Sequence, residues 1–171
     1  MRKILEVIAL AALAFQVGIT VDAFYGPHRL PDRIPIHFDQ QGMPNGWGTP
    51  ADLPFFLPAI ALGVYLLLAV IARFPESFNY PVAVNDSNRG RLQTLTLGML
   101  TWMRMEMPCI FAAIQWIILQ GARHPQGGFS PRIGWIILAL VILLLGTVGW
   151  HIAAMFRARS DAGPGQTPGL G

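Results

Sequence analysis

Three histidines and two aspartates outside the long apolar runs are the residues best suited to bind a metal ion. His28 and His37 share a loop with Asp32 and Asp39, and His124 follows the third apolar run. Imidazole and carboxylate groups are ligands for zinc and copper. Their spacing matches no metal-binding motif, so we expect no metal and no other cofactor, and we keep the three histidines as weak candidates.

Two ionisable residues, Arg104 and Glu106, interrupt the third apolar run. Such residues inside a membrane span are functional candidates by default. Counted back from Gln120, they lie about 6 Å and about 9 Å from the inner edge of a hydrocarbon core about 30 Å thick. We expect Arg104 to extend to that edge, and Glu106 to pair with another helix or to be protonated. A structural role is the main expectation, and an ion or proton path is the alternative.

The sequence contains no catalytic motif and has the composition of a membrane protein. Ser-His-Asp spacing, a nucleophile elbow, paired carboxylates and a Gly-rich phosphate loop are all absent, so we expect no enzyme. Of the 171 residues, 53% are hydrophobic and only 12% are charged, which is about half the usual charged share. Mean hydropathy is +0.48. The net charge of +3 comes from residues that flank apolar runs, as orientation signals do, and does not indicate nucleic-acid binding.

Four apolar runs predict an all-α integral membrane protein, a bundle of four transmembrane helices. A span needs about 20 apolar residues. The predicted spans are residues 4–22, 55–72, 101–120 and 133–154. They form one membrane domain over residues 1–156, with a long extracytoplasmic loop at 24–53. Residues 92–100 are expected to protrude into water or lie on the membrane surface. The tail, 157–171, is rich in Gly, Pro, Ser and Ala, so we expect it to be disordered and cytoplasmic.

The distribution of Lys and Arg predicts the orientation in the membrane. With the N terminus inside, the inner segments hold seven of these residues and the outer segments four. Because cytoplasmic loops carry the excess of positive charge, both termini are expected in the cytoplasm.

The loop before the second span is long and rich in turn-forming residues, which suggests a function. Pro31 and Pro35 favour extended chain, and Ile34–Phe38 alternates enough for a short strand or for a segment on the bilayer surface. Gly42 and the Asn45-Gly46 pair are expected to mark turns. The residues predicted to form a motif or a partner-binding surface are Pro31, Pro35, His37, Phe38, Asp39, Gly42, Pro44, Asn45, Gly46 and Trp47.

This loop resembles the bacterial membrane family called domain of unknown function 1648, which also forms the N-terminal part of SdpI-type toxin-immunity proteins. The matching positions are Leu30, Pro31, Ile34, Pro35, His37, Phe38, Gly42, Pro44, Asn45 and Gly46. Family members more often carry Asn at the position of Asp39 and Asp at that of Asn45. The segments 73–75, 78–82 and 88–89 are similar to the inner loop of one branch of the family. The resemblance implies a multi-pass protein of the bacterial inner membrane.

Three functions remain open. The first is a non-catalytic inner-membrane protein whose outer loop contacts a protein or peptide partner, or a larger membrane complex. The second, implied by the resemblance alone, is a toxin-immunity or signalling component of SdpI type. The third is a small transport or metal-handling protein, suggested by Glu106 and the outer histidines.

Overall fold

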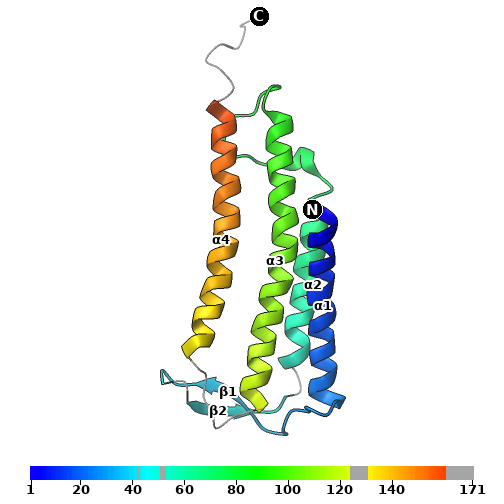
Figure 1. Ribbon diagram of the computed structural model, residues 1–171, viewed down its shortest axis with the longest axis vertical. Helices are drawn as coiled ribbons and strands as arrows, with labels where there is room; N and C mark the ends of the chain where they lie inside the picture. Colours follow the sequence, from blue (N-terminus) through cyan, green and yellow to red (C-terminus); the bar gives the residue numbers. More distant parts are fainter. Residues whose placement is uncertain (42, 51–52, 124–130, 161–171) are drawn as a thin grey trace, which may run out of the picture.

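The computed structural model describes residues 1–41, 43–50, 53–123 and 131–160 and contains four helices and one β-hairpin (Figure 1). The elements, in chain order, are α1 (Arg2–Tyr25), β1 (Ile34–Phe38), β2 (Pro44–Gly48), α2 (Leu53–Ile71), the short 3₁₀ turn η1 (Pro75–Ser77), α3 (Arg89–Arg123) and α4 (Pro131–Ser160). The expected helical architecture is confirmed. We call the end of the bundle that carries the hairpin the hairpin end, and the other the opposite end.

Three of the helices are long and apolar enough to cross a membrane, namely α1, α3 and α4. The remaining helix, α2, is apolar but shorter. Its 19 residues extend over about 28 Å. By length and composition, these helices are those of a membrane protein.

The central helix is α3, because α1 and α2 pack against it and α4 packs on its other side (Figure 1). Its 35 residues extend well beyond the predicted span at 101–120. The preceding turns do not project alone as expected, since Leu92 is fully buried with Met155 and Ala158 of α4 and with Val82. The reason is that α4 also continues farther than expected, to Ser160, and covers them.

The start of the predicted tail is therefore corrected. Residues 157–160 belong to the last turn of α4, and Ala158 is buried against α3. Residues 161–171 lie outside the described residues.

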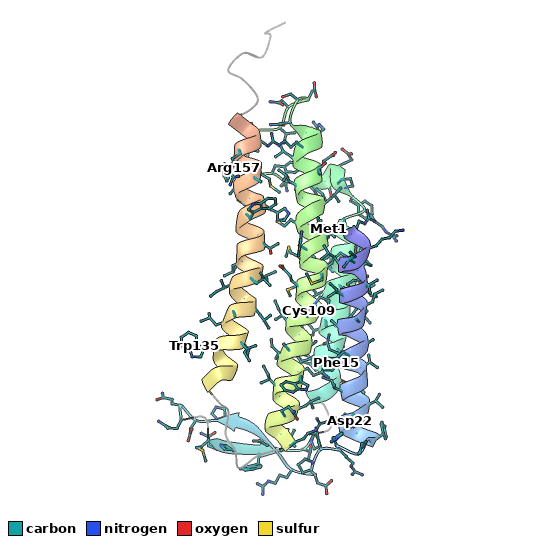
Figure 2. All side chains as sticks on the ribbon, viewed as in Figure 1. Met1, Phe15, Asp22, Cys109, Trp135 and Arg157 are labelled. Carbon is teal, nitrogen blue, oxygen red and sulfur yellow. The ribbon has the colours of Figure 1, made fainter. Side chains whose placement is uncertain are left out.

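Apolar side chains cover the outside of this bundle, and several polar side chains are buried inside it. The buried polar or charged residues in the helices are Gln16, Thr20, Thr96, Glu106, Gln115 and His151. On the outside, Trp135 projects away from α4 and is 70% exposed (Figure 2). Lipid is as apolar as leucine, so leucine gains little by leaving it, whereas polar groups must find partners inside the protein. The distribution fits a bundle surrounded by lipid.

The predicted strand at Ile34–Phe38 is confirmed, and it pairs with β2 in an antiparallel hairpin. The facing residues are Ile34 and Gly48, Pro35 and Trp47, His37 and Gly46, and Phe38 and Pro44. The expectation of a turn at Asn45-Gly46 is wrong, because both residues lie in β2. The chain reverses earlier, where the Asp39 carboxylate accepts hydrogen bonds from the backbone N–H groups of Gln41 and Met43. Gly42 lies outside the described residues.

One side of the hairpin packs on the ends of the helices. Ile34 has no exposed surface and lies with Leu30, Ala23 of α1, and Leu119 and Ala122 of α3. This small apolar cluster fixes the hairpin across the ends of α1 and α3. The hairpin thus depends on how these two helices are placed.

The close approach of the two strands predicts the effect of a methyl group at position 46. A Cβ atom on Gly46 would lie 2.8 Å from the Cβ atom of His37. Gly46→Ala should therefore force the strands apart and destabilise the hairpin by about 1–3 kcal/mol. Faster amide hydrogen exchange in residues 34–38, measured by mass spectrometry, is the expected result.

The matched control is Gly18→Ala, because nothing lies within 4 Å of a Cβ atom added at Gly18. It should leave hairpin exchange unchanged. Equal exchange in wild type and Gly46→Ala would show that the strands do not approach this closely.

Candidate functional site

The side of the hairpin that faces away from the helices presents a mixed polar and apolar surface, which we call the hairpin face. Met43 and Trp47 are 50% and 41% exposed. The guanidinium carbon of Arg33 lies 5.8 Å from the Trp47 ring centroid, a cation–π contact. His37 Nδ1 and Asn45 Oδ1 are hydrogen-bonded, and both residues are exposed. These five residues form the hairpin face.

An ion pair near the hairpin joins the ends of α1 and α3. Arg123 donates through Nη2 to the Asp22 carboxylate at 2.8 Å and through Nε to the carbonyl oxygen of His28 at 2.9 Å. His28 Nδ1 lies 3.2 Å from the other oxygen of Asp22. These contacts fix the residues that follow α1 against both helices.

The opposite end of the bundle has a second ion pair between α1 and α3. Arg104 Nη2 donates to Glu6 Oε1 at 2.7 Å and to the Tyr65 hydroxyl of α2 at 3.1 Å. The Tyr65 hydroxyl donates to the same Glu6 oxygen, and its ring centroid lies 4.8 Å from the Arg104 guanidinium carbon. We call these three residues the inner triad; it connects three helices. Arg104 is thus paired within the protein, a partnership that the expectation of an extended side chain had missed.

Glu6 and Tyr65 are the residues of the inner triad that sequence reasoning did not identify as functional. A signal for Glu6 was present in its spacing, because Glu6 and Asp22 lie sixteen residues apart on α1, and their partners Arg104 and Arg123 lie nineteen apart on α3. Two parallel helices with acids on one and bases on the other at similar separations can form both pairs at once.

Neutral polar groups join α1 and α3 between the two ion pairs. The Gln16 side-chain amide donates to the carbonyl oxygen of Pro108 at 3.2 Å. The Gln115 amide donates to the Thr20 hydroxyl at 2.6 Å and to the backbone oxygen of Gln16 at 3.3 Å. The helix α3 continues through Pro108. Together with the ion pairs, these bonds place hydrogen-bonding contacts along the length of α1.

Glu106 faces α4, the other neighbour of α3. Its Oε1 accepts a 2.6 Å hydrogen bond from the Thr147 hydroxyl, and the backbone oxygen of Thr147 lies 2.8 Å from His151 Nδ1. Glu106 as a whole is 3% exposed. Gly98 of α3 leaves room for His151, since a Cβ atom there would lie 3.4 Å from the imidazole Nε2. The expected pairing of Glu106 with another helix is therefore confirmed.

The loop between α2 and α3 is fixed by Asn88. Asn88 Oδ1 accepts from the Asn85 backbone N–H at 2.9 Å, and its amide donates to the carbonyl oxygen of Ala83 at 3.0 Å. Burial raises the pKa of the Tyr80 phenol in this loop, and the nearby Glu76 carboxylate raises it further. Tyr80 therefore stays protonated and packs beside the buried contact between α3 and α4.

The structure does not bring the candidate histidine ligands together. His28 lies beside Asp22 and Arg123, while His37 bonds to Asn45 in the hairpin. His124 lies outside the described residues. Within the described part of the chain, no group of three or more His, Cys, Asp or Glu side chains is arranged to hold a metal ion.

The contact between Glu106 and Thr147 predicts a selective effect on the α3–α4 contact. Thr147→Val keeps the side-chain shape but removes the donor to a buried carboxylic oxygen, so it should destabilise the bundle by about 1 kcal/mol. The measurement is unfolding of the detergent-solubilised protein by increasing SDS, followed by tryptophan fluorescence.

Thr101→Val is the matched control, since among the described residues the Thr101 hydroxyl bonds only to the carbonyl of Leu97 in its own helix, at 2.7 Å. Its effect should be much smaller. Equal destabilisation by both variants would contradict a specific role for the Glu106 contact.

Comparison with known proteins places the hairpin inside a recognised domain. Residues 8–62 match the family model described as "Domain of unknown function (DUF1648)". The match covers most of α1, the whole hairpin and the first half of α2. No curated protein and no solved structure matches the chain. The chain therefore contains a DUF1648 domain, formed by residues 8–62.

Proposed function

We propose that this protein is a binding protein of the bacterial inner membrane that uses its hairpin face to contact a protein or peptide partner outside the cytoplasm. In this proposal all four helices cross the membrane and both termini are cytoplasmic. The excess of Lys and Arg at the opposite end of the bundle supports this orientation. The function requires no catalytic step.

The observation that carries the proposal is the difference between the two sides of the hairpin. One side is fixed to the helices through fully buried Ile34, and the other exposes Met43 and Trp47 beside polar groups. A rigid surface loses little conformational entropy on binding. Exposed Trp, Met and Arg are also the residue types enriched at the centres of protein interfaces.

The apolar helix α2 is short, but its length is compatible with a fourth membrane span. Its helix of about 28 Å approaches the thickness of a hydrocarbon core of about 30 Å. It also lies among longer neighbours, and its Tyr65 takes part in the inner triad with α1 and α3. A span so connected can cross a locally thinned bilayer at modest cost.

The test uses an impermeant, thiol-reactive photocrosslinker applied to intact spheroplasts. Single-cysteine variants are made in a Cys109→Ala background, because Cys109 is the only native cysteine. Met43→Cys, on the hairpin face, should be labelled and should give a discrete crosslinked product after irradiation. Asp86→Cys, in the exposed loop between α2 and α3, should remain unlabelled.

Tyr25→Cys is the matched outer control, because Tyr25 is 84% exposed at the hairpin end but lies outside the hairpin. It should be labelled without giving the product obtained from position 43. Labelling of Asp86→Cys but not Met43→Cys would contradict the proposed orientation. Identical crosslinked products from positions 25 and 43 would contradict specific binding by the hairpin face. A small peptide as the crosslinked partner would favour the toxin-immunity alternative.

A further inference from the structure

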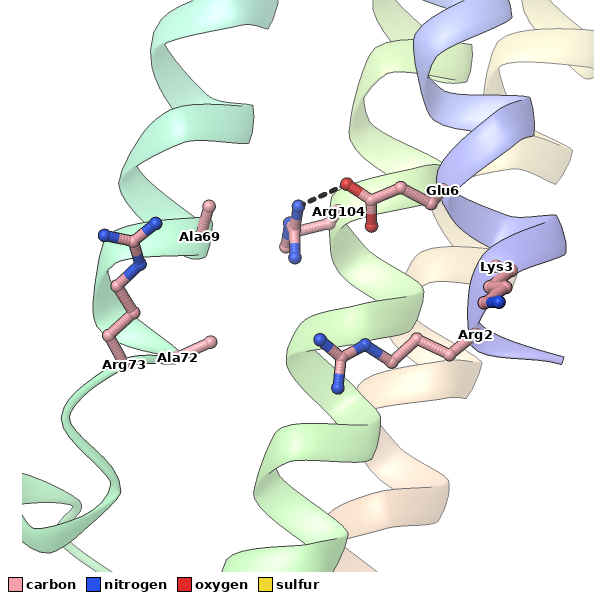
Figure 3. A pocket seen from close by; sticks show the side chains of 7 residues that line it. All are labelled: Arg2, Lys3, Glu6, Ala69, Ala72, Arg73 and Arg104. Atoms are coloured by element: carbon pink, nitrogen blue, oxygen red, sulfur yellow. Dashed lines mark hydrogen bonds and ion pairs between the residues drawn. The ribbon is translucent and has the colours of Figure 1, made fainter.

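A hollow of about 680 Å³ opens on the half of the bundle away from the hairpin, between the start of α1, the end of α2 and the middle of α3 (Figure 3). We call it the inner hollow. Its charged lining consists of Arg2, Lys3, Arg73, Arg104 and Glu6. At the end of α2, Ala69 and Ala72 have small side chains that leave the space open, and Arg73 follows them.

The charges around the inner hollow do not balance. Four basic side chains face one carboxylate, and that carboxylate already accepts hydrogen bonds from Arg104 and Tyr65. Within the described residues, no acidic group forms an ion pair with Arg2, Lys3 or Arg73. Figure 3 shows Arg73, just after the end of α2, across the hollow from Glu6 and Arg104. The lining is therefore suited to an anion.

Arg104, which lines the hollow, also has an unused hydrogen-bond donor. Its side chain is 17% exposed, and its Nε atom is buried with no hydrogen-bond partner among the described residues. A buried donor without a partner costs free energy. An anion in the inner hollow would reduce the net positive charge around this side chain.

The position of the hollow indicates a ligand at the membrane surface. Arg2 and Lys3 lie at the start of α1 and Arg73 follows the end of α2, and the neighbouring residues Ile4 and Val70 expose 64% and 52% of their surface. Basic pockets between membrane helices bind phospholipid headgroups, and guanidinium groups suit phosphate oxygens in particular. An anionic lipid could place its phosphate in the hollow and its acyl chains along the apolar sides of α1 and α2.

We propose that the inner hollow binds a phosphate-bearing anion. Two sources supply this chemistry, an anionic phospholipid headgroup and a free phosphate ion, and the adjoining apolar helix surfaces favour the lipid. The proposal does not depend on the function of the hairpin face, which lies at the other end of the molecule (Figure 1).

The experiment titrates the purified full-length protein in neutral detergent with short-chain phosphatidylglycerol, short-chain phosphatidylcholine or inorganic phosphate, and measures the shift in thermal unfolding midpoint. The test variant is Arg2→Gln with Arg73→Gln, since both side chains are exposed and leave the inner triad intact. The control is Arg89→Gln, an equally exposed arginine at the start of α3 that does not line the hollow.

Wild type and Arg89→Gln should bind phosphatidylglycerol alike, and the double variant should bind it about thirtyfold more weakly, because each cation at a membrane surface contributes about a factor of five. Ala69→Leu, which fills the hollow without changing its charge, should also weaken phosphatidylglycerol binding. This variant replaces the double variant as the test if the double variant does not fold. A response to inorganic phosphate that is lost in the same variants would identify a soluble anion as the source.

Three results would overturn the proposal. The first is an equal response of the double variant and wild type to phosphatidylglycerol and to inorganic phosphate. The second is a loss of phosphatidylglycerol binding in Arg89→Gln as large as in the double variant, which would show that binding depends on the overall charge alone. The third is a phosphatidylcholine shift as large as that of phosphatidylglycerol, which would reflect the apolar chains alone.

Discussion

The arrangement of this protein depends on the pairing of polar side chains between α1 and α3 in a surrounding that offers them no water. Arg104 meets Glu6 at one end of the shared interface, and Arg123 meets Asp22 at the other. Apolar packing alone specifies little in lipid, since a leucine gains no more from a helix than from an acyl chain. An unpaired charge at the same depth is costly. The paired groups therefore select one rotation and one axial position of α1 against α3.

The position of the hairpin follows from that selection. The apolar cluster below Ile34 has members from α1, from α3 and from the loop between them, so it forms only when the two helix ends lie side by side. Arg123 stabilises this arrangement of the helix ends by donating hydrogen bonds to the Asp22 carboxylate and to the backbone oxygen of His28. A segment of thirty residues that reads as a loop thereby becomes a fixed surface at one end of the bundle.

The sequence predicts the parts of this structure that depend on local composition. Apolar runs located the four helices, and alternation located the strand at Ile34–Phe38. Helix ends were less predictable, because the extra turns of α3 and α4 are stabilised by contacts between the two helices. Leu92 of α3 packs there against Met155 and Ala158 of α4. The Asn45-Gly46 pair has turn-forming residues, yet the Asp39 carboxylate bonds to the backbone and places the reversal earlier.

Some residues of the candidate sites could likewise be predicted from the sequence, and others could not. The hairpin residues could be found from their pattern, and Arg104 and Glu106 from being charges in an apolar run. Their partners could not, because Glu6, Tyr65 and Thr147 are distant in sequence and become neighbours only through helix packing. The inner hollow was also hidden, since its basic residues come from α1, from α3 and from the turn after α2, and Arg2, Lys3 and Arg73 each read as an orientation signal.

The most direct measurement of the central claim is a double-mutant cycle on Glu6 and Arg104, with the free energy of unfolding measured in mixed detergent micelles. Glu6→Gln and Arg104→Gln each leave a charge without its partner, whereas the double variant leaves none. The account predicts that the double variant is more stable than the sum of the single effects allows, by about 1–2 kcal/mol. Additive effects within about 0.3 kcal/mol would contradict it, because the two side chains would then not interact in the folded bundle.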